Sequence, residues 1–190
     1  MYYLESHYQE DLRRDLETKV LKGHQLKIQS IHLHISFREQ AFQTQTFLLP
    51  AVTVLEALSF QKSRVHLSKK ASSHQRLQKG KVSGISTTLR GRKIYGFLAN
   101  LQNRLLPSLK TFEKIPLTSL DSQGNLHWRI SKAFAFPEVE EEYEHFHSRI
   151  PSTASWQEKD FLPLDISLNT TARNPHEGRL LLTAFQLPFF

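Results

Sequence analysis

The sequence predicts an α+β fold, in which a single domain holds a largely antiparallel sheet with helices packed on one face. Apolar residues recur at helical spacing in some segments and alternate with period two in others. The segments follow the order helix, strand, helix, strands, helix, strands, helix, which differs from the regular alternation of a parallel sheet. The length of 190 residues fits one domain, and the sequence shows no internal repeat.

The first two helices are predicted from apolar spacing. In residues 2–22, apolar side chains recur every four positions from Leu4 to Val20, and Gly23 follows as a C-cap. Residues 47–60 return to helical spacing, and Pro50 is tolerated there because it falls in the first turn. A helix is therefore expected on each side of the first strand.

The other two helices carry clear end signals. The third begins near Ile94 and must stop before Pro107, because a residue that precedes proline is disfavoured in the helical conformation. The last begins with Asn174 as N-cap, Pro175 at the first helical position and a carboxylate two residues later, and it should extend to about Gln186.

The first strand is predicted at residues 26–35, where apolar and polar residues alternate. Its two histidines, His32 and His34, fall on the face opposite the apolar side chains. Further strands are expected at residues 64–67, 85–89, 126–130 and 164–168. A long basic loop at 68–84, a turn at 121–125 and an insertion at about 140–161 are expected between them.

The charge distribution points to a polyanionic partner. Between Glu56 and Glu113 the chain has twelve Lys and Arg residues and no Asp or Glu, and ten of the twelve fall between Lys62 and Lys93. Residues 1–100 hold 16 basic and 7 acidic groups (net +9), whereas residues 101–190 hold 9 and 11 (net −2). The phosphate backbone of RNA or DNA is the leading candidate, and a basic loop that serves only solubility is the alternative.

Composition also bounds the compartment and the chemistry. The chain has no cysteine, so neither a disulfide framework nor a thiolate metal site is expected. No apolar run reaches the roughly 20 residues that span a bilayer. The N-terminal residues are neither a signal peptide nor a transit peptide, so we expect the protein to act where it is made or after removal of a targeting segment.

Several patterns could suggest catalysis or metal binding, and each has a plainer explanation. The histidine pairs at 32/34 and 145/147 lack a third ligand at suitable spacing, so no structural zinc site is expected, and His32 and His34 are expected to face RNA or solvent. The glutamates at 138–144 are interpreted as an acidic surface stretch that faces basic neighbours. Phe134 and Phe136 could stack on bases, but core packing is favoured. No nucleotide-binding or triad motif is present, so we expect no enzyme activity.

Three stretches resemble the ribosomal protein L-five family, which binds 5S rRNA in the large subunit. Residues 88–98 (TLRGRKIYGFL) are similar to the family's T-L-R-G-x-x-M-Y-x-F-L junction. Residues 121–138 resemble its F-D-G-x-G-N-Y hairpin and F-P-E tail. Residues 64–80 resemble the ends of its basic loop, and the three stretches follow in family order over nearly the whole chain.

The resemblance implies the family's fold and two RNA-facing groups of residues. The expected rRNA-binding residues are Gln61, Lys62, Arg64, Thr88, Arg90, Arg92, Lys93 and His34. The expected tRNA-facing loop residues are Lys69, Lys70, His74, Arg76, Lys79 and Lys81. Phe60-Gln61-Lys62 stands where the family has G-Q-K, and His34 stands where the family has an RNA-contacting asparagine.

The resemblance also implies partners and a location. The partners would be 5S rRNA or its organellar replacement, large-subunit rRNA, the P-site tRNA and neighbouring ribosomal proteins, including one in the small-subunit head. No membrane partner, homo-oligomer or cofactor is expected, and any structural Mg²⁺ would belong to the rRNA. Lost family glycines and 13 phenylalanines favour a mitochondrial matrix ribosome. An RNA-processing enzyme or maturase accessory factor outside the ribosome is the alternative, and a membrane-surface protein is a third.

Overall fold

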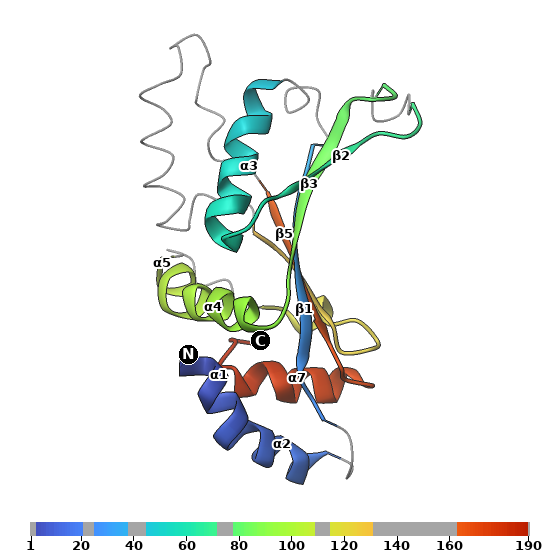
Figure 1. Ribbon diagram of the computed structural model, residues 1–190. Helices are drawn as coiled ribbons and strands as arrows, with labels where there is room; N and C mark the ends of the chain where they lie inside the picture. The colour runs from blue at the N-terminus through green and yellow to red at the C-terminus, as the bar shows by residue number, and fades with distance from the viewer. Residues whose placement is uncertain are drawn as a thin grey trace. The chain divides into compact units, whose positions relative to one another are not determined.

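The computed structural model is an α+β fold around a five-stranded antiparallel sheet in the order β2-β3-β1-β5-β4 (Figure 1). It describes residues 3–20, 25–37, 45–71, 78–108, 115–130 and 163–189. The strands are β1 (Ile28–Ser36), β2 (Arg64–Leu67), β3 (Val82–Leu89), β4 (Leu126–Ile130) and β5 (Leu164–Thr170). The predicted fold class is therefore confirmed.

Contacts between strands show the antiparallel register. The β2 residues Arg64 and Val65 lie opposite Ser86 and Ile85, so the numbers rise on one strand and fall on the other. On β1 and β5, Ser30 is bonded to Asn169, whereas His34 lies beside Asp165. Because this register fixes which side chains are neighbours, it decides which polar groups meet on the sheet.

The described chain divides into two compact units. Unit 1 comprises Met1–His32, Thr88–Trp128 and Ile166–Phe190, and unit 2 comprises Leu33–Thr87 and Arg129–Asp165. Unit 1 holds α1 (Tyr3–His7), α2 (Arg13–Lys19), α4 (Arg92–Asn100), α5 (Leu106–Ser108), α7 (Pro175–Ala184) and a 3-10 turn at Leu117–Ser119. Unit 2 holds α3 (Gln45–Ser59). The prediction of a single domain stays a prediction.

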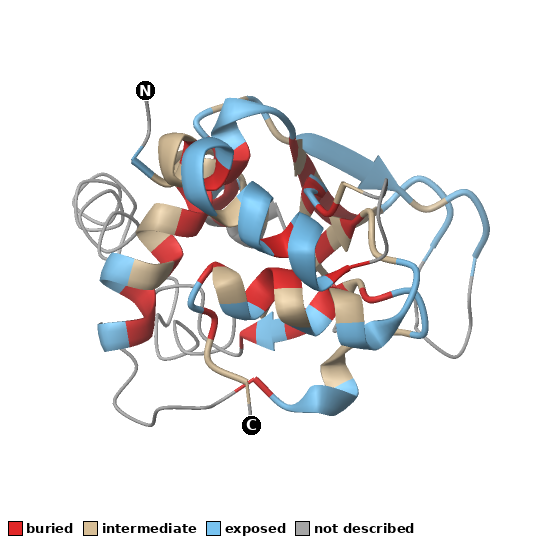
Figure 2. Cartoon of the chain, turned by 90° about the horizontal axis from the view of Figure 1, so that it is seen from below, coloured by how far each residue is buried: buried red, intermediate tan, exposed pale blue. Residues whose placement is uncertain are grey.

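The alternation of burial along the strands separates a core face from a polar face. On β1, the core residues Ile31, Leu33 and Ile35 are at most 1% exposed, and His32 and His34 between them are half-buried. β4 and β5 show the same alternation. The helices likewise have a buried and an exposed side (Figure 2). The polar side chains of the strands are consequently gathered on the face away from the core.

A π-helical turn explains the four-residue spacing in the N-terminal helix. Strict spacing by four drifts around an α-helix, which has 3.6 residues per turn. The π turn at Tyr8–Leu12 between α1 and α2 has a wider hydrogen-bond step than an α-helical turn. It therefore compensates for this drift, and Tyr8 and Leu16 are both buried. The Tyr8 hydroxyl donates a hydrogen bond to the Leu26 carbonyl at 2.5 Å. Burial, with a contribution from Tyr95, raises the pKa of Tyr8 to about 12.

The prediction that the third helix stops before Pro107 is wrong, because the helix contains a second π turn and continues past that residue. The helix continues from α4 through a π turn at Leu101–Leu105 into α5, which contains Pro107. In an α-helix the proline ring would meet the carbonyl four residues back. Here the Leu106 N–H bonds to the Leu101 carbonyl, five residues back, and we attribute the tolerance of proline to this wider turn.

Other element ends differ slightly from their predictions. β3 begins at Val82, which pairs with Leu67, so residues 82–84 belong to a strand and not to the basic loop. The last helix ends at Ala184, two residues earlier than expected, and Asn174 makes no side-chain cap hydrogen bond. Its first turn is held by Glu177, which accepts a hydrogen bond from the Arg173 backbone N–H at 2.9 Å. Gly23 and the 140–161 insertion lie outside the described residues.

The 121–125 turn packs against helix α7 through two glycines, one in each segment. Gly124 has φ +78° and Gly178 is buried in the helix. A Cβ on Gly178 would lie 2.6 Å from the Gly124 Cα, and a Cβ on Gly124 would lie 2.8 Å from the Asn174 carbonyl oxygen. Only glycine at both positions therefore permits this backbone contact.

Candidate nucleic-acid interface

The first polar cluster lies on β1, β3 and β5 within unit 1, and we call it the neutral row (Ser30, His32, Thr88, Asn169). The Thr88 hydroxyl lies 2.9 Å from His32 Nδ1, and Ser30 Oγ lies 3.2 Å from His32 Nε2. Asn169 Nδ2 donates to Ser30 Oγ at 3.4 Å. Which of Thr88 and Ser30 donates and which accepts depends on the tautomer of His32, because a neutral imidazole has one donor and one acceptor nitrogen. The row fixes the position of several groups that can bond to sugar or base edges.

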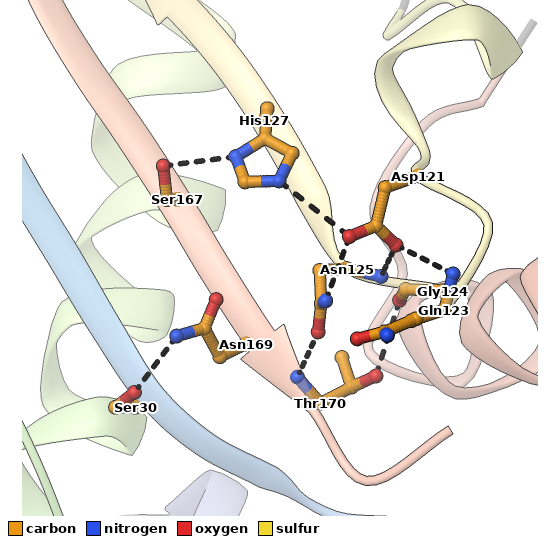
Figure 3. A network of polar contacts seen from close by, with 9 residues as sticks. All are labelled: Ser30, Asp121, Gln123, Gly124, Asn125, His127, Ser167, Asn169 and Thr170. Carbon is orange, nitrogen blue, oxygen red and sulfur yellow. Dashed lines mark hydrogen bonds and ion pairs between the residues drawn. The ribbon is translucent and has the colours of Figure 1, made fainter. Parts of the chain in front are cut away.

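The 121–125 turn supports the neighbouring side chains of β4 and β5 (Figure 3). His127 Nδ1 lies 3.1 Å from Ser167 Oγ, and His127 Nε2 lies 3.8 Å from the Asp121 carboxylate. Asp121 accepts bonds from the backbone N–H groups of Gln123 and Asn125 and from the Asn125 amide. Burial alone would raise the pKa of Asp121, but these hydrogen bonds and His127 outweigh it and lower the pKa.

The second polar cluster lies within unit 2, and we call it the charged row (His34, His66, Ser86, Arg129, Asp165). Arg129 binds Asp165 through two hydrogen bonds, at 2.5 and 2.9 Å. His34 Nδ1 lies 3.8 Å from the same carboxylate, and His66 Nε2 lies 2.6 Å from Ser86 Oγ. The bond to Asp165 raises the pKa of Arg129 further, so the guanidinium is charged and largely balanced by the acid.

The turn between α3 and β2 positions Gln61, which was expected to bind rRNA. Gln61 Nε2 donates to Thr87 Oγ1 at 2.8 Å, and Ser59 Oγ donates to the Gln61 carbonyl at 3.1 Å. Thr87 is buried, on the opposite face of β3 from Thr88. One amide hydrogen of Gln61 is thus used inside the protein, whereas the neighbouring Lys62 is exposed.

The junction from β3 to α4 presents three cations. Arg90, Arg92 and Lys93 are all exposed, around a Gly91 whose φ of +61° suits glycine. Arg92 Nε lies 3.4 Å from Glu5 Oε1, while its side chain remains 78% exposed. The basic groups at the start of α4 therefore point to solvent, where phosphate could reach them.

The remaining predicted residues fall on β2 and on the segment after it. Arg64 on β2 is exposed, as are Lys69, Lys70, Lys79 and Lys81. His74 and Arg76 lie outside the described residues, as do Phe134, Phe136 and the glutamates at 138–144. The structure thus brings Thr88 together with His32 and places most predicted cations at the surface, but their RNA contacts stay predictions.

The sequence also contained a signal for residues that we did not predict. His127 and Arg129 alternate with buried residues on β4, and Asp165, Ser167 and Asn169 do so on β5. The same period-two argument that separated His32 from the β1 core would have placed all five on the polar face.

Among the described residues, no group of three or more His, Asp or Glu side chains could hold a metal ion. No helix in the described part is long and apolar enough to cross a membrane.

Comparison with known proteins identifies the family. A model of the C-terminus of the ribosomal L5 family matches residues 82–189, a range that holds β3, α4, β4, β5 and α7. Large ribosomal subunit protein uL5m of Reclinomonas americana is 33% identical over 191 residues, which cover 99% of this chain and 98% of that protein. The chain belongs to the ribosomal L5 family.

Two further ribosomal L5 relatives agree. Large ribosomal subunit protein uL5c of Paulinella chromatophora is 31% identical over 150 residues, or 79% of this chain and 76% of that protein. Large ribosomal subunit protein uL5 of Francisella philomiragia subsp. philomiragia is 29% identical over 192 residues, or 100% and 99%. The family resemblance predicted from the motifs is confirmed. The matched C-terminal range includes Thr88 and Arg90 but not Gln61.

Proposed function

We propose that this ribosomal L5 chain is a non-catalytic protein of the large subunit of a mitochondrial ribosome. It would bind 5S rRNA, or its organellar replacement, together with large-subunit rRNA in the central protuberance. Family membership and the names of the full-length relatives support the ribosomal role. The mitochondrial assignment is supported by the uL5m relative, although a uL5c relative also matches.

One observation carries the RNA-binding proposal: every described lysine and arginine between positions 62 and 93 is exposed. These residues are Lys62, Arg64, Lys69, Lys70, Lys79, Lys81, Arg90, Arg92 and Lys93. The sequence has no acid from position 57 through 112, and Arg92 lies beside Glu5 while its side chain stays 78% exposed. Such a surface attracts phosphate, and each contact that forms releases counterions.

The polar rows would add hydrogen bonds at fixed positions to this electrostatic attraction. Phosphate contacts set affinity and carry no sequence information directly, whereas hydrogen bonds to sugars and bases can discriminate. The neutral row offers a hydroxyl, an imidazole and an amide that are held in fixed positions by one another. We therefore assign 5S rRNA recognition to Thr88 and its neighbours, with Arg90 and Arg92 on phosphates.

The basic residues after β2 would serve a different RNA. Lys69, Lys70, Lys79 and Lys81 lie outside the regular strands and are exposed. Long, flexible lysine side chains bind phosphate as point charges and impose little geometry. We assign this segment to the P-site tRNA, near a protein of the small-subunit head.

Recovery of the protein from its organelle tests the proposal directly. A tagged copy should sediment with large subunits, and sequencing of the bound RNA should return large-subunit rRNA and 5S rRNA. Purified protein should bind a 5S rRNA transcript with a slope of log K against log salt of about −3.5 to −4.5, if about five phosphates are neutralised. Recovery of precursor RNAs outside ribosomal particles would instead support the RNA-processing alternative.

A further inference from the structure

Glu5 on helix α1 is a buried acid, and the proposed function does not yet use its charge. The residue is 7% exposed, whereas Glu10 and Asp11 on the next turn are exposed. Its Oε2 atom has no hydrogen-bond partner among the described residues. Burial of a carboxylate oxygen without a partner costs stability, so an acid kept in such a position is a candidate for function.

Glu5 lies where α1 packs against α4, within unit 1. The ring of Tyr8, directly after α1, has its centroid 6.1 Å from that of Tyr95 on α4. Burial, and then the charge of Glu5, raise the pKa of Tyr95 above its ordinary value of 10.0. The Glu5 carboxylate is therefore held between two packed helices and acts on groups of α4.

The carboxylate faces Arg92, which is the first residue of α4. Glu5 Oε1 lies 3.4 Å from Arg92 Nε, and the Arg92 side chain remains 78% exposed. A guanidinium carries five N–H donors in one plane, so an acid beside Nε can orient the plane while other donors bind a second anion. Arg92 is thus contacted by a buried acid on one side and largely open to solvent on the other.

The start of α4 favours an anion as the second ligand of Arg92. Arg90 just before the helix is also exposed, and the first turn of α4 contains no acid. The N-terminus of a helix carries a partial positive charge, so cations placed there are unfavourable unless an anion balances them. Glu5 supplies part of this balance from the buried side, and a phosphate group of RNA would supply more from the solvent side.

We propose that Glu5 is a positioning residue, which orients the Arg92 guanidinium toward a phosphate of ribosomal RNA. This inference rests on the proposed function, because it requires the chain to bind rRNA. Removal of an exposed acid adds positive charge and should strengthen the attraction to RNA. Removal of Glu5 makes the same change in charge but should weaken binding, because Arg92 loses its orientation.

Filter binding to transcripts of 5S rRNA and of large-subunit rRNA tests the inference. E5Q should bind about 3- to 5-fold more weakly to the transcript that the wild type binds, because Glu5 and Arg92 act as a coupled pair. R92Q should lose at least as much affinity, and its log–log salt slope should be shallower by about 1. In the R92Q background, E5Q should cause no further loss. The matched control E10Q changes the charge equally at an exposed site and should bind at least as tightly as the wild type.

Thermal unfolding separates positioning from a purely structural role. Because Arg92 is mostly exposed, loss of the Glu5 charge leaves no buried cation behind. The thermal midpoints of E5Q and of the apolar variant E5M should therefore equal or exceed that of the wild type, and E5M should lose as much affinity as E5Q. A lower midpoint in both variants, in proportion to their loss of affinity, would assign Glu5 to stability and overturn the inference.

The binding outcomes separate this inference from the proposed function. If the wild type binds neither transcript, the proposed function fails and the inference fails with it. If the wild type binds but E5Q binds equally well or more tightly, the inference alone is overturned. An equal loss from E5Q in the wild-type and R92Q backgrounds would show that Glu5 acts independently of Arg92, which also overturns it.

Discussion

The neutral row and the charged row share strands β1, β3 and β5 but differ in the charge of their side chains. In the neutral row, His32 shares hydrogen bonds with the hydroxyl groups of Thr88 and Ser30. In the charged row, Arg129 and His34 converge on Asp165. Neither row concentrates positive charge, whereas the described cations between positions 62 and 93 are all exposed. Recognition geometry and electrostatic attraction are thus assigned to different residues, which can be changed separately.

The largest effect is expected when exposed cations are removed. The quadruple variant K62Q/R64Q/R90Q/R92Q should bind a 5S rRNA transcript on the order of 100- to 1,000-fold more weakly at physiological salt, and its log–log salt slope should be shallower by about 3 to 4. Filter binding over a range of KCl concentrations measures both. The variant K19Q/K27Q/R173Q/R179Q changes net charge equally, at exposed sites outside the basic segment. An equal loss in that variant would show that net charge alone sets affinity.

A smaller effect is expected from the neutral row. T88V keeps the shape of Thr88 but removes its bond to His32. We expect a loss of about 10-fold in 5S rRNA affinity, because the hydroxyl is also proposed to bond to the RNA. A hydrogen bond lost with its partner left unsatisfied costs about 1–3 kcal/mol. The salt slope should not change. T53V is the control, because it removes a hydroxyl on helix α3 that donates to the Leu49 carbonyl of the same helix. A shallower slope in T88V would contradict the separation of the two roles.

The charged row should respond in the opposite direction. D165N removes the acid that Arg129 and His34 share, so RNA affinity should rise a few-fold while discrimination between 5S rRNA and unrelated RNA falls. Because the Arg129 side chain is 47% exposed, the free energy of unfolding should fall by less than about 1 kcal/mol. Competition binding and urea unfolding measure the two effects. D15N, on helix α2, removes an exposed acid and controls for net charge.

The smallest effect concerns the turn beside the neutral row. The pKa of Asp121 is lowered in the folded protein, so its carboxylate stabilises the fold above its ordinary pKa of 3.8, and this contribution is lost as pH falls through the lowered value. D121N should therefore be less stable than the wild type at pH 7, and the difference should shrink below about pH 4. Urea unfolding at several pH values measures this difference. A difference that does not vary with pH would mean that the charge of Asp121 does not support the turn.

Periodicity predicted most of the fold because burial decides it. The alternation in residues 26–35 placed Ile31 in the core and His32 on the polar face, as observed. The π turns could not be predicted, since they differ from an α-helix by one hydrogen-bond step and leave little trace in the sequence; this is why Pro107 was misjudged. The length of β3 depends on pairing with β2, which is not local information.

The sequence predicted which cations belong to the candidate site, but not which of its polar residues contact one another. Charge density along the chain identified the cations, and exposure of the described ones follows from the cost of burying charge. The Thr88–His32 and Arg129–Asp165 contacts join residues far apart in sequence, so the register of the sheet had to be known first. The left-handed conformation of Phe60, with φ +51°, could not be predicted either, because a phenylalanine does not favour this conformation.

The contact between Gly124 and Gly178 constrains the evolution of this chain. A side chain at either position would enter the backbone of the partner segment, so neither glycine can be replaced while the other segment keeps its place. A compensating change would have to move the turn and helix α7 together, which one nucleotide substitution does not accomplish. The two codons are therefore expected to be inherited as a fixed pair, even where neighbouring positions of the gene diverge quickly.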